Sequence, residues 1–254
     1  MTTSDPFTMN GQRVLVTGGT RGIGRAISIR MATAGATVLA GYARNDDAAE
    51  ALVQEATGAE LSIEPVRADL TTPKGIERLA EALGSLERLD TLVHCAASGV
   101  HRPIRELTPR QFDFTINANV RSFLTVVQTA LPLMRNGGAI VAVSSEGAVR
   151  AVPSYGAVGS SKAALESLAR HLAVELAPDR IRVNVLSPGT VKTDAWAARP
   201  DADSRLAAAA ARTPTGHLTT VDEVASAAQF LCSAAAAGVV GHTLVVDGGK
   251  RIVE

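Results

Sequence analysis

The feature that most constrains the fold is a regular alternation of two kinds of segment. Short apolar, β-branched runs occur at 14–16, 37–42, 61–67, 91–96, 139–144, 182–186 and 243–246. Segments of helical periodicity lie between them, at 22–34, 47–56, 73–83, 109–134, 154–176 and 221–232. Because parallel strands need a crossover between them, this order predicts an α/β fold with a doubly wound parallel sheet of about seven strands and helices on both faces.

The chain shows no linker, internal repeat or charge block that would divide it. Its 254 residues, 46% of them hydrophobic, are enough for one large α/β core. We therefore predict a single domain over 1–254. The one long irregular stretch, 188–216, is rich in alanine and carries a candidate helix at 204–211. A loop of that length in a compact domain favours a lid over a binding site.

The composition excludes several classes of function. Twenty-five basic residues balance 25 acidic ones, which leaves no electrostatic footprint for nucleic acid or an anionic membrane. No run reaches the ~18 apolar residues of a membrane span, and residues 1–10 lack a signal-peptide pattern. The two cysteines and five scattered histidines predict no disulfide framework and no metal site. We expect a cytoplasmic protein without nucleic-acid or membrane partners.

A glycine-rich turn follows the first expected strand and opens the first expected helix. Residues 17–24 read Thr-Gly-Gly-Thr-Arg-Gly-Ile-Gly. Glycines let a pyrophosphate approach the backbone, and the helix N-terminus offers unpaired N–H groups to the phosphates. The strand–turn–helix context makes this motif a strong indication of dinucleotide binding. The expected contacts come from Gly18, Thr20, Arg21, Gly22, Ile23 and Gly24.

Ordered motifs along almost the whole chain resemble the short-chain dehydrogenase/reductase family. The glycine turn has the spacing TGxxxGxG, Asn119 matches the family's catalytic asparagine, and Ser144-Ser145 ends the fifth strand. The resemblance implies a Rossmann-like fold with a dinucleotide-binding half (11–135) and a catalytic half (136–254). It implies Asn119, Ser145 and Lys162 as catalytic residues. It also implies cofactor contacts from Asp69, Leu70, Ala96, Lys162, Pro188, Gly189, Val191 and Thr193.

One segment departs from the family pattern. Where the family usually has Asn-Asn-Ala-Gly after the fourth strand, this chain has His94-Cys95-Ala96-Ala97. Ala96 keeps the small size that the adenosine ribose requires. Cys95 fits a small residue at a buried strand end better than a nucleophile.

The end of the second strand bears on the choice of cofactor. NAD-binding proteins place an acidic residue there to bind the ribose 2′-hydroxyl. Here the position is about Tyr42, and no carboxylate occurs before Asp46. Arg21 and Arg44 could bind a 2′-phosphate with their planar guanidinium groups. The sequence therefore predicts NADPH rather than NADH.

The catalytic tyrosine of the family is displaced in this chain. Family reductases carry Tyr-x-x-x-Lys, but Val158 stands four residues before Lys162, and the tyrosine is Tyr155. Spacings of four and seven return to nearly the same helix face, so Tyr155 is expected on the Lys162 side, about one turn (roughly 5 Å) nearer the helix start. An enoyl thioester accepts hydride at C3 while charge builds on the more distant carbonyl oxygen. A donor displaced by one turn suits that oxygen.

The Tyr-x6-Lys spacing also resembles the enoyl-acyl-carrier-protein reductases, and 96–103 resembles their NADPH-dependent type. This implies NADPH-dependent reduction of the C=C bond of a 2-enoyl thioester, carried by acyl carrier protein or coenzyme A, in fatty-acid or polyketide-type biosynthesis. The expected substrate contacts are Ser98, Ser145, Tyr155 and Val158. The resemblance also implies a homo-oligomer, a tetramer or dimer. Two alternatives stay open: a ketoreductase or alcohol dehydrogenase acting on C=O, and a non-catalytic dinucleotide-binding protein.

Overall fold

The strands form one parallel sheet in the order β3-β2-β1-β4-β5-β6-β7. A computed structural model describes residues 5–193 and 202–253. The strands are β1 (Arg13–Thr17), β2 (Thr37–Tyr42), β3 (Ile63–Arg67), β4 (Thr91–His94), β5 (Gly138–Val143), β6 (Ile181–Pro188) and β7 (Thr243–Val246). The strand order reverses between β1 and β4, which is where ligands bind in open α/β sheets. The predicted doubly wound sheet of seven strands is confirmed.

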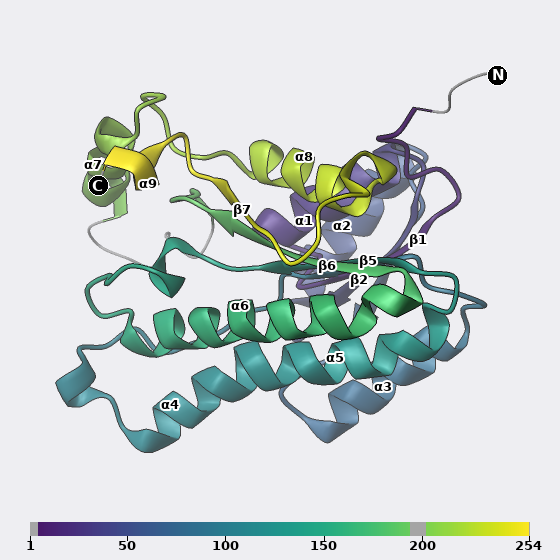
Figure 1. Cartoon of the computed structure of the whole chain (residues 1–254), viewed down its shortest axis with the longest axis horizontal. Helices are drawn as coiled ribbons and strands as arrows, with labels where there is room; N and C mark the ends of the chain where they lie inside the picture. The colour runs from purple at the N-terminus through teal and green to yellow at the C-terminus, as the bar shows by residue number, and fades with distance from the viewer. Residues whose placement is uncertain (1–4, 194–201, 254) are drawn as a thin grey trace.

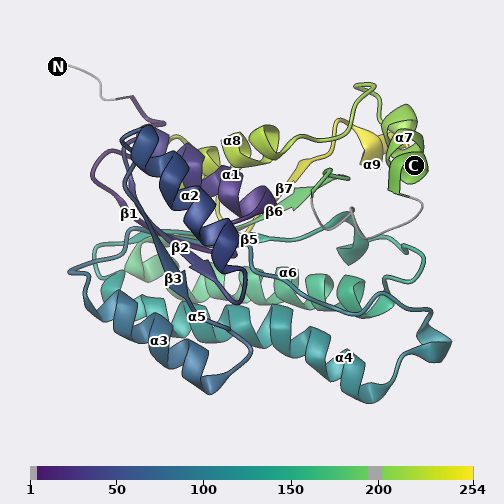
Figure 2. The same ribbon diagram turned by 180° about the vertical axis from the view of Figure 1, so that it is seen from behind.

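Helices cover both faces of the sheet (Figures 1 and 2). One layer holds α1, α2 and α8, and the other holds α3, α4, α5 and α6. The helices are α1 (Gly22–Thr33), α2 (Asp46–Gly58), α3 (Pro73–Gly84), α4 (Pro109–Ile116), α5 (Ser122–Ala130), α6 (Gly156–Leu176), α7 (Ala202–Arg212), α8 (Val221–Cys232) and α9 (Lys250–Val253).

Each face of the sheet has its own apolar core. Buried side chains of β4, β5 and β6 pack against α3, α5 and α6 on one face, around the fully buried Phe123. On the other face, Ile27 and Met31 of α1 meet Val224 and Leu231 of α8. Because both faces are covered, the strands read as continuous apolar runs rather than as alternating ones.

The expected helix over 109–134 is present as one run of helical turns from Pro109 to Leu133. A π-helical turn, Asn117–Arg121, joins α4 to α5, and a 3₁₀ turn, Leu131–Leu133, follows α5. The apolar periodicity did not predict the π-turn, because such a turn absorbs one extra residue and leaves the core-facing sides of the flanking helices aligned. The predicted helix is confirmed, and Asn119 lies inside its π-turn.

Several other boundaries differ from the expected ones. Helix α6 begins at Gly156 rather than at residue 154, because Ser154 has a positive φ of 60°. Strand β3 begins at Ile63, and β4 ends at His94, before Ala96. In the expected lid the predicted helix is present as α7, whereas residues 194–201 lie outside the described part. In the described ranges, no helix is long and apolar enough to cross a membrane.

Candidate functional site

The glycine-rich turn lies where β1 and β4 diverge, and each of its four glycines has no room for a side chain or has left-handed backbone. A Cβ on Gly19 would lie 2.7 Å from the carbonyl oxygen of Val16. A Cβ on Gly18 would lie 2.9 Å from the Ala96 backbone, and Gly18 has a φ of 66°. A Cβ on Gly24 would lie 2.0 Å from the carbonyl oxygen of Gly18. Gly22 has a φ of 53° and faces Thr193, whose Cγ2 would be 3.5 Å from a Cβ. The backbone is thus exposed where a pyrophosphate would lie, and this geometry fits a dinucleotide.

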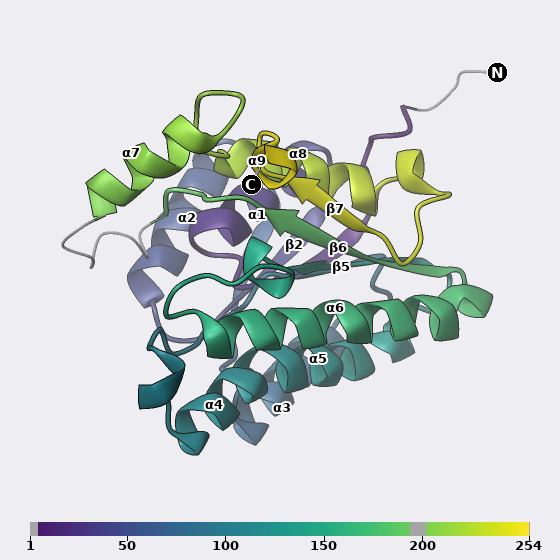
Figure 3. The same ribbon diagram turned by 60° about the vertical axis from the view of Figure 1, so that its left-hand side comes forward.

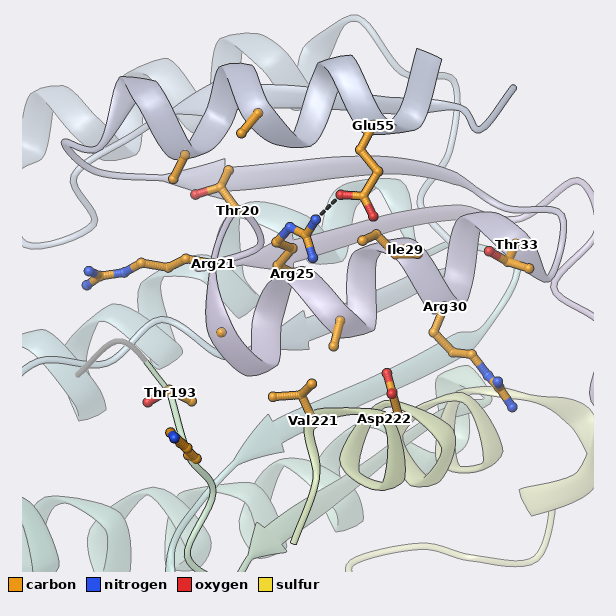
Figure 4. A pocket seen from close by; sticks show the side chains of 15 residues that line it. Thr20, Arg21, Arg25, Ile29, Arg30, Thr33, Glu55, Thr193, Val221 and Asp222 are labelled. Carbon is orange, nitrogen blue, oxygen red and sulfur yellow. Dashed lines mark hydrogen bonds and ion pairs between the residues drawn. The ribbon is translucent and has the colours of Figure 1, made fainter. Parts of the chain in front are cut away.

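The N-terminus of α1 leaves its first N–H groups for a ligand. Its N-cap residue, Arg21, makes no side-chain capping bond, and no acidic residue lies in the first turn. Unpaired N–H groups and the positive end of the helix dipole favour phosphate there. Figure 4 shows Arg21 pointing away from the ion pair that Arg25 makes with Glu55 of α2. A groove of about 650 Å³ continues from this turn between α1, α2 and the start of α8.

At the end of β2, polar side chains are joined in a network. The hydroxyl of Tyr42 donates to Asp46 at 3.0 Å, and the largely exposed Arg44 lies 3.3 Å from Asp69. Asp69 also accepts a hydrogen bond from the Thr71 hydroxyl at 2.6 Å, which lowers the pKa of its carboxyl group. Its neighbour Leu70 packs against the core. The guanidinium of Arg44 is thus held beside the sheet edge by a carboxylate.

His94 takes over a structural role at the end of β4. Its Nδ1 lies 3.1 Å from the Thr17 hydroxyl, and that oxygen accepts a bond from the N–H of Ala96. Its ring packs against Phe123 at a centroid distance of 5.2 Å. Burial, and secondarily the nearby Lys162, lowers the pKa of His94 to about 3, so the imidazole is neutral. His94, at the position where the family usually has asparagine, therefore ties β4 to β1.

Lys162 lies deep beneath the carboxyl end of β5. Its Nζ donates to the carbonyl oxygen of Val143 at 2.7 Å, and the residue is 5% exposed. Burial lowers the pKa of this ammonium group to about 8, while Cys95 and Glu166 oppose that shift. Burial also raises the pKa of the Cys95 thiol to about 11, which disfavours a thiolate nucleophile.

Tyr155 is the N-cap of α6, one residue outside the helix. Its ring packs against Gly147 of the 3₁₀ turn η4 (Glu146–Ala148), where a Cβ would lie 2.5 Å from the ring. The ring also lies against Gly159, and the His101 ring is nearly perpendicular to it at a centroid distance of 5.2 Å. Gly159 lies one turn into α6, so the ring follows the face of the helix that carries Lys162. A hollow of about 280 Å³ opens beside Tyr155, between η4 and Ile104.

Ser145 and Val158 flank this position. Ser145 is half-buried, and its hydroxyl accepts the N–H of Gly147 at 3.1 Å. Val158, which stands at the family's tyrosine position, is 5% exposed. Its Cγ2 would lie 2.5 Å from a Cβ on Gly99, and Gly99 also closes on Thr115. The space at 158 is therefore filled by apolar packing.

Asn119 connects the loop after β4 with α6. Its Oδ1 accepts the N–H of Ser98 at 2.9 Å, and its Nδ2 donates to the Ser161 hydroxyl at 2.8 Å. Asn119 is fully buried. The nearby Asn117 instead donates to the carbonyl oxygen of Thr71 at 3.3 Å. The amide of Asn119 thus holds Ser98 and the helix that carries Lys162 at a fixed spacing.

The segment after β6 closes the site from the other side. Pro188 is the last residue of β6, and the N–H of Gly189 donates to Val246 of β7 at 2.8 Å. Val191 forms an isolated bridge with Thr219. Together with the contact of Thr193 with Gly22, these bonds place the segment beside the glycine turn.

Two polar pairs near the site have no counterpart in the sequence prediction. Ser144 donates to the buried Glu166 at 2.6 Å, and Lys250 forms an ion pair with Glu146 at 2.9 Å. Lys250 and Glu146 are 104 residues apart, so no local pattern could reveal their contact. The only available signal was that Lys250 is one of four lysines. In the described ranges, no cluster of three or more His, Cys, Asp or Glu residues could hold a metal ion.

Comparison with known proteins agrees with this geometry. Residues 18–251 match the family model described as enoyl-(acyl carrier protein) reductase. The chain is 38% identical to 1-cyclohexenylcarbonyl-CoA reductase of Streptomyces collinus over 94% of this chain and 86% of that protein. It is also 38% identical to human L-xylulose reductase over 94% of this chain and 96% of that protein.

A solved structure shares the whole fold. The gluconate 5-dehydrogenase of Burkholderia cenocepacia J2315, in complex with NADP and tartrate, superposes with a TM-score of 0.87. Its sequence is 28% identical, and the match covers 98% of each chain. Taken with the parallel sheet, the glycine turn and the family model, these findings show that the chain is an oxidoreductase-type member of the short-chain dehydrogenase/reductase family.

Proposed function

We propose that this protein is an NADPH-dependent reductase of the C=C bond of a 2-enoyl thioester. The product is the saturated acyl thioester. The observation that carries the proposal is the position of the only tyrosine near Lys162, namely Tyr155 at the start of α6. The name of the Streptomyces collinus relative, a reductase of an enoyl-type CoA thioester, supports the same class of substrate.

The packing of Val158 is the second part of the argument. A carbonyl reductase needs its proton donor at the oxygen of the very carbon that receives hydride. At position 158 an apolar side chain is closed in by Gly99 and Thr115, and it has no proton to give. A donor at Tyr155 suits an oxygen two bonds farther from the reacting carbon, as in a thioester conjugated with C=C.

The proposed cofactor is NADPH. When bound, the nicotinamide supplies the hydride. The glycine turn and the N-terminus of α1 would hold the pyrophosphate, and Arg44 with Arg21 would meet the 2′-phosphate. No acidic residue follows β2 before Asp46, and Asp46 is already bound by Tyr42 and Arg67. The NADP in the related gluconate 5-dehydrogenase structure supports this choice.

The residues of this chain have separate proposed tasks. The Tyr155 hydroxyl donates a hydrogen bond to the thioester oxygen and stabilises the enolate that forms there. Ser145 offers a second hydroxyl on the same side. The buried ammonium of Lys162 holds positive charge beneath the site and favours the developing anion. Asn119 and His94 hold the surrounding loops at a fixed spacing.

Reduction of a C=O group is the second candidate function. The human L-xylulose reductase and the gluconate 5-dehydrogenase relatives carry names of that class, which favours it. On this alternative, Tyr155 would serve as the proton donor of a ketoreductase. A non-catalytic dinucleotide-binding protein is the third candidate, and it predicts cofactor binding without turnover.

We further propose a carrier and an assembly. The thioester is on acyl carrier protein or coenzyme A, in a fatty-acid or polyketide-type pathway of the cytoplasm. The exposed aromatic side chains of Phe112 and Phe114 on α4, with Val174 on α6, favour a homo-oligomer that buries these helices.

A paired assay tests the function. Crotonyl-CoA and acetoacetyl-CoA are supplied at equal concentration with NADPH, and again with NADH, while oxidation of the cofactor is followed. We expect turnover of crotonyl-CoA with NADPH to exceed each of the other three combinations at least tenfold. Turnover of acetoacetyl-CoA alone would overturn the proposal in favour of the ketoreductase. Cofactor binding without oxidation in any arm would favour the non-catalytic alternative.

A further inference from the structure

The segment 247–251, which we call the C-terminal turn, contacts both walls of the candidate site. Asp247 organises the turn: its two carboxylate oxygens accept the N–H groups of Gly249 and Arg251, each at 2.9 Å. Gly248 and Gly249 have φ values of 63° and 87°. Figure 3 shows α9 beside the ends of β6 and β7. The chain therefore turns back over the carboxyl edge of the sheet directly after β7.

On one side the turn contacts the end of β6 and the segment that follows it, where Gly189, Val191 and Thr193 are expected to contact the cofactor. A guanidinium nitrogen of Arg251, Nη2, donates to the Ser187 hydroxyl of β6 at 2.8 Å. A Cβ on Gly189 would lie 2.9 Å from Cα and Cβ of Asp247. The position of the backbone that follows β6 is thus set against the C-terminal turn.

On the other side the turn contacts η4. Lys250 Nζ reaches both carboxylate oxygens of Glu146, at 2.9 and 3.1 Å. The guanidinium of Arg150, just after η4, donates to the carbonyl oxygen of Arg251. The Lys250 and Glu146 side chains are 11% and 25% exposed. An ion pair so shielded is less screened by salt than one on the open surface.

Turn η4 is the part of the site that requires accurate placement. It follows Ser145 directly, and Gly147 within it forms the surface on which the Tyr155 ring rests. The turn is only three residues long, so Ser145 and the surface under the Tyr155 ring move together with it. A shift of η4 would therefore move both proposed hydroxyl donors relative to the segment after β6.

We propose that Lys250, through its ion pair with Glu146, is a positioning residue that fixes the distance between residues 187–193, at and after the end of β6, and the Ser145–Tyr155 side of the site. A misplacement of about 1 Å can lower a turnover rate by up to 10²-fold, so a single partly buried ion pair at this place affects catalysis without touching substrate. This proposal rests on one part of the proposed function, namely that Ser145 and Tyr155 contact the substrate. It does not depend on which bond is reduced.

The same turn also contacts the end of α7. A Cβ on Gly248 would lie 2.4 Å from the Thr215 hydroxyl and 2.6 Å from Thr213 Cγ2, and the Thr215 N–H donates to the Gly248 carbonyl at 3.3 Å. The segment after α7 and η4 are thus both in contact with the C-terminal turn. A change in the position of the C-terminal turn would therefore also move Thr213 and Thr215, which belong to the expected lid.

The test compares Lys250→Met, Glu146→Gln, Lys250→Arg and the exchanged pair Glu146→Lys/Lys250→Glu in the full chain. The matched control is Glu87→Gln, which removes the exposed ion pair with Arg13 at 3.9 Å. For each variant kcat, KM, the Kd for NADPH and the melting temperature are measured on the thioester that the wild type reduces best. We expect kcat to fall about tenfold in Lys250→Met and Glu146→Gln, with the Kd for NADPH within about twofold of wild type. Lys250→Arg and the exchanged pair should recover most of the lost kcat.

Two outcomes would overturn the proposal. The first is a kcat within twofold of wild type in both single variants. The second is a loss that the folded fraction explains fully, or that neither Lys250→Arg nor the exchanged pair recovers. A wild type that reduces only the keto thioester would refute the proposed C=C reduction. It would leave this comparison intact, because the variants are then compared on the keto substrate.

Discussion

The glycine turn before α1 and the η4 turn before α6 lie at the same edge of the sheet but present different chemical groups to the candidate site. Each lies at a strand end and leads into a helix without a side-chain cap, at Arg21 and at Tyr155. By contrast, α2, α3, α4 and α8 begin with side-chain caps from Asn45, Thr72, Thr108 and Thr220. The uncapped starts of α1 and α6 both face the candidate site.

The two turns differ in what they present. The first presents backbone: tight approaches of Gly18 and Gly24 leave N–H groups for an anion. The second presents side chains, because the absence of a side chain at Gly147 makes room for the Tyr155 ring. The Tyr155 hydroxyl is then the group proposed to act on the substrate. A site built from backbone N–H groups follows from the local sequence. A site built from side chains depends on whether neighbouring residues, such as Gly147, leave room for them. The following predictions separate these two kinds of turn.

The largest effect should come from removing the Tyr155 hydroxyl. In Tyr155→Phe the ring can still pack on Gly147, so we expect the fold to remain and kcat on the enoyl thioester to fall by about 100-fold. The Kd for NADPH should stay within about twofold, because the glycine turn is unchanged. Steady-state kinetics and fluorescence titration with NADPH measure the two quantities.

The matched control is the only other tyrosine. Tyr42→Phe loses the bond to Asp46 at the far end of the proposed cofactor site. We expect it to change the KM for NADPH and not kcat. An equal loss of kcat in both variants would contradict the separation between the two turns.

A smaller effect should follow from filling the glycine turn. In Gly24→Ala the new Cβ would lie 2.0 Å from the Gly18 carbonyl oxygen, so the turn must open. We expect the Kd for NADPH to rise about tenfold, the equivalent of about 1.4 kcal/mol, and the melting temperature to fall. Gly58→Ala is the control, because a Cβ there has nothing within 4 Å. Equal affinities in the two variants would refute the backbone role of the turn.

The smallest effect concerns pH. Burial lowers the pKa of Lys162 to about 8, and its charged form exists below that value. Activity that depends on the cation should therefore fall as the pH rises, by about half at pH 8 and by about tenfold at pH 9. The pH profile of kcat for the enoyl thioester measures this limb.

The glycine turn should not share that dependence. Affinity for 2′,5′-ADP, which reaches only the adenosine side of the proposed site, should stay constant between pH 7.5 and about 9 if backbone N–H groups hold it. A flat kcat profile, or an affinity for 2′,5′-ADP that falls in step with kcat, would contradict the distinction.

Local rules predicted much of the fold. The bounds of β2, β7 and α8 coincide with the expected ranges, because local signals set them: apolar runs in the two strands and the cap of Thr220 just before α8. The glycine turn was equally readable, since its chemistry belongs to eight consecutive residues. In these parts the sequence neighbours are also the structural neighbours.

The candidate side-chain site was harder to predict. The bonds of Asn119 with Ser98 and Ser161 span 21 and 42 residues. The positive φ of Ser154 puts Tyr155 outside the helix on which its orientation was argued, although the ring still lies against Gly159 of that helix. The roles of Tyr155, Ser145 and Lys162 remain predictions for the experiments above.

The π-helical turn at Asn117–Arg121 has a consequence for how this chain can vary in length. A π-turn amounts to one residue inserted into an α-helix. Removing Ala118, for example, would leave an α-helical turn in its place, and α4 and α5 would keep the faces that they present, because the π-turn accommodates the extra residue locally. The side chains of the turn itself would be re-aimed, so Asn119 would lose the position from which it binds Ser98 and Ser161. Elsewhere in α4 or α5, the loss of one residue would rotate one part of the helix by about 100° relative to the other. Related chains can therefore lose a residue from this turn without repacking the flanking helices, but not without losing the contacts of Asn119.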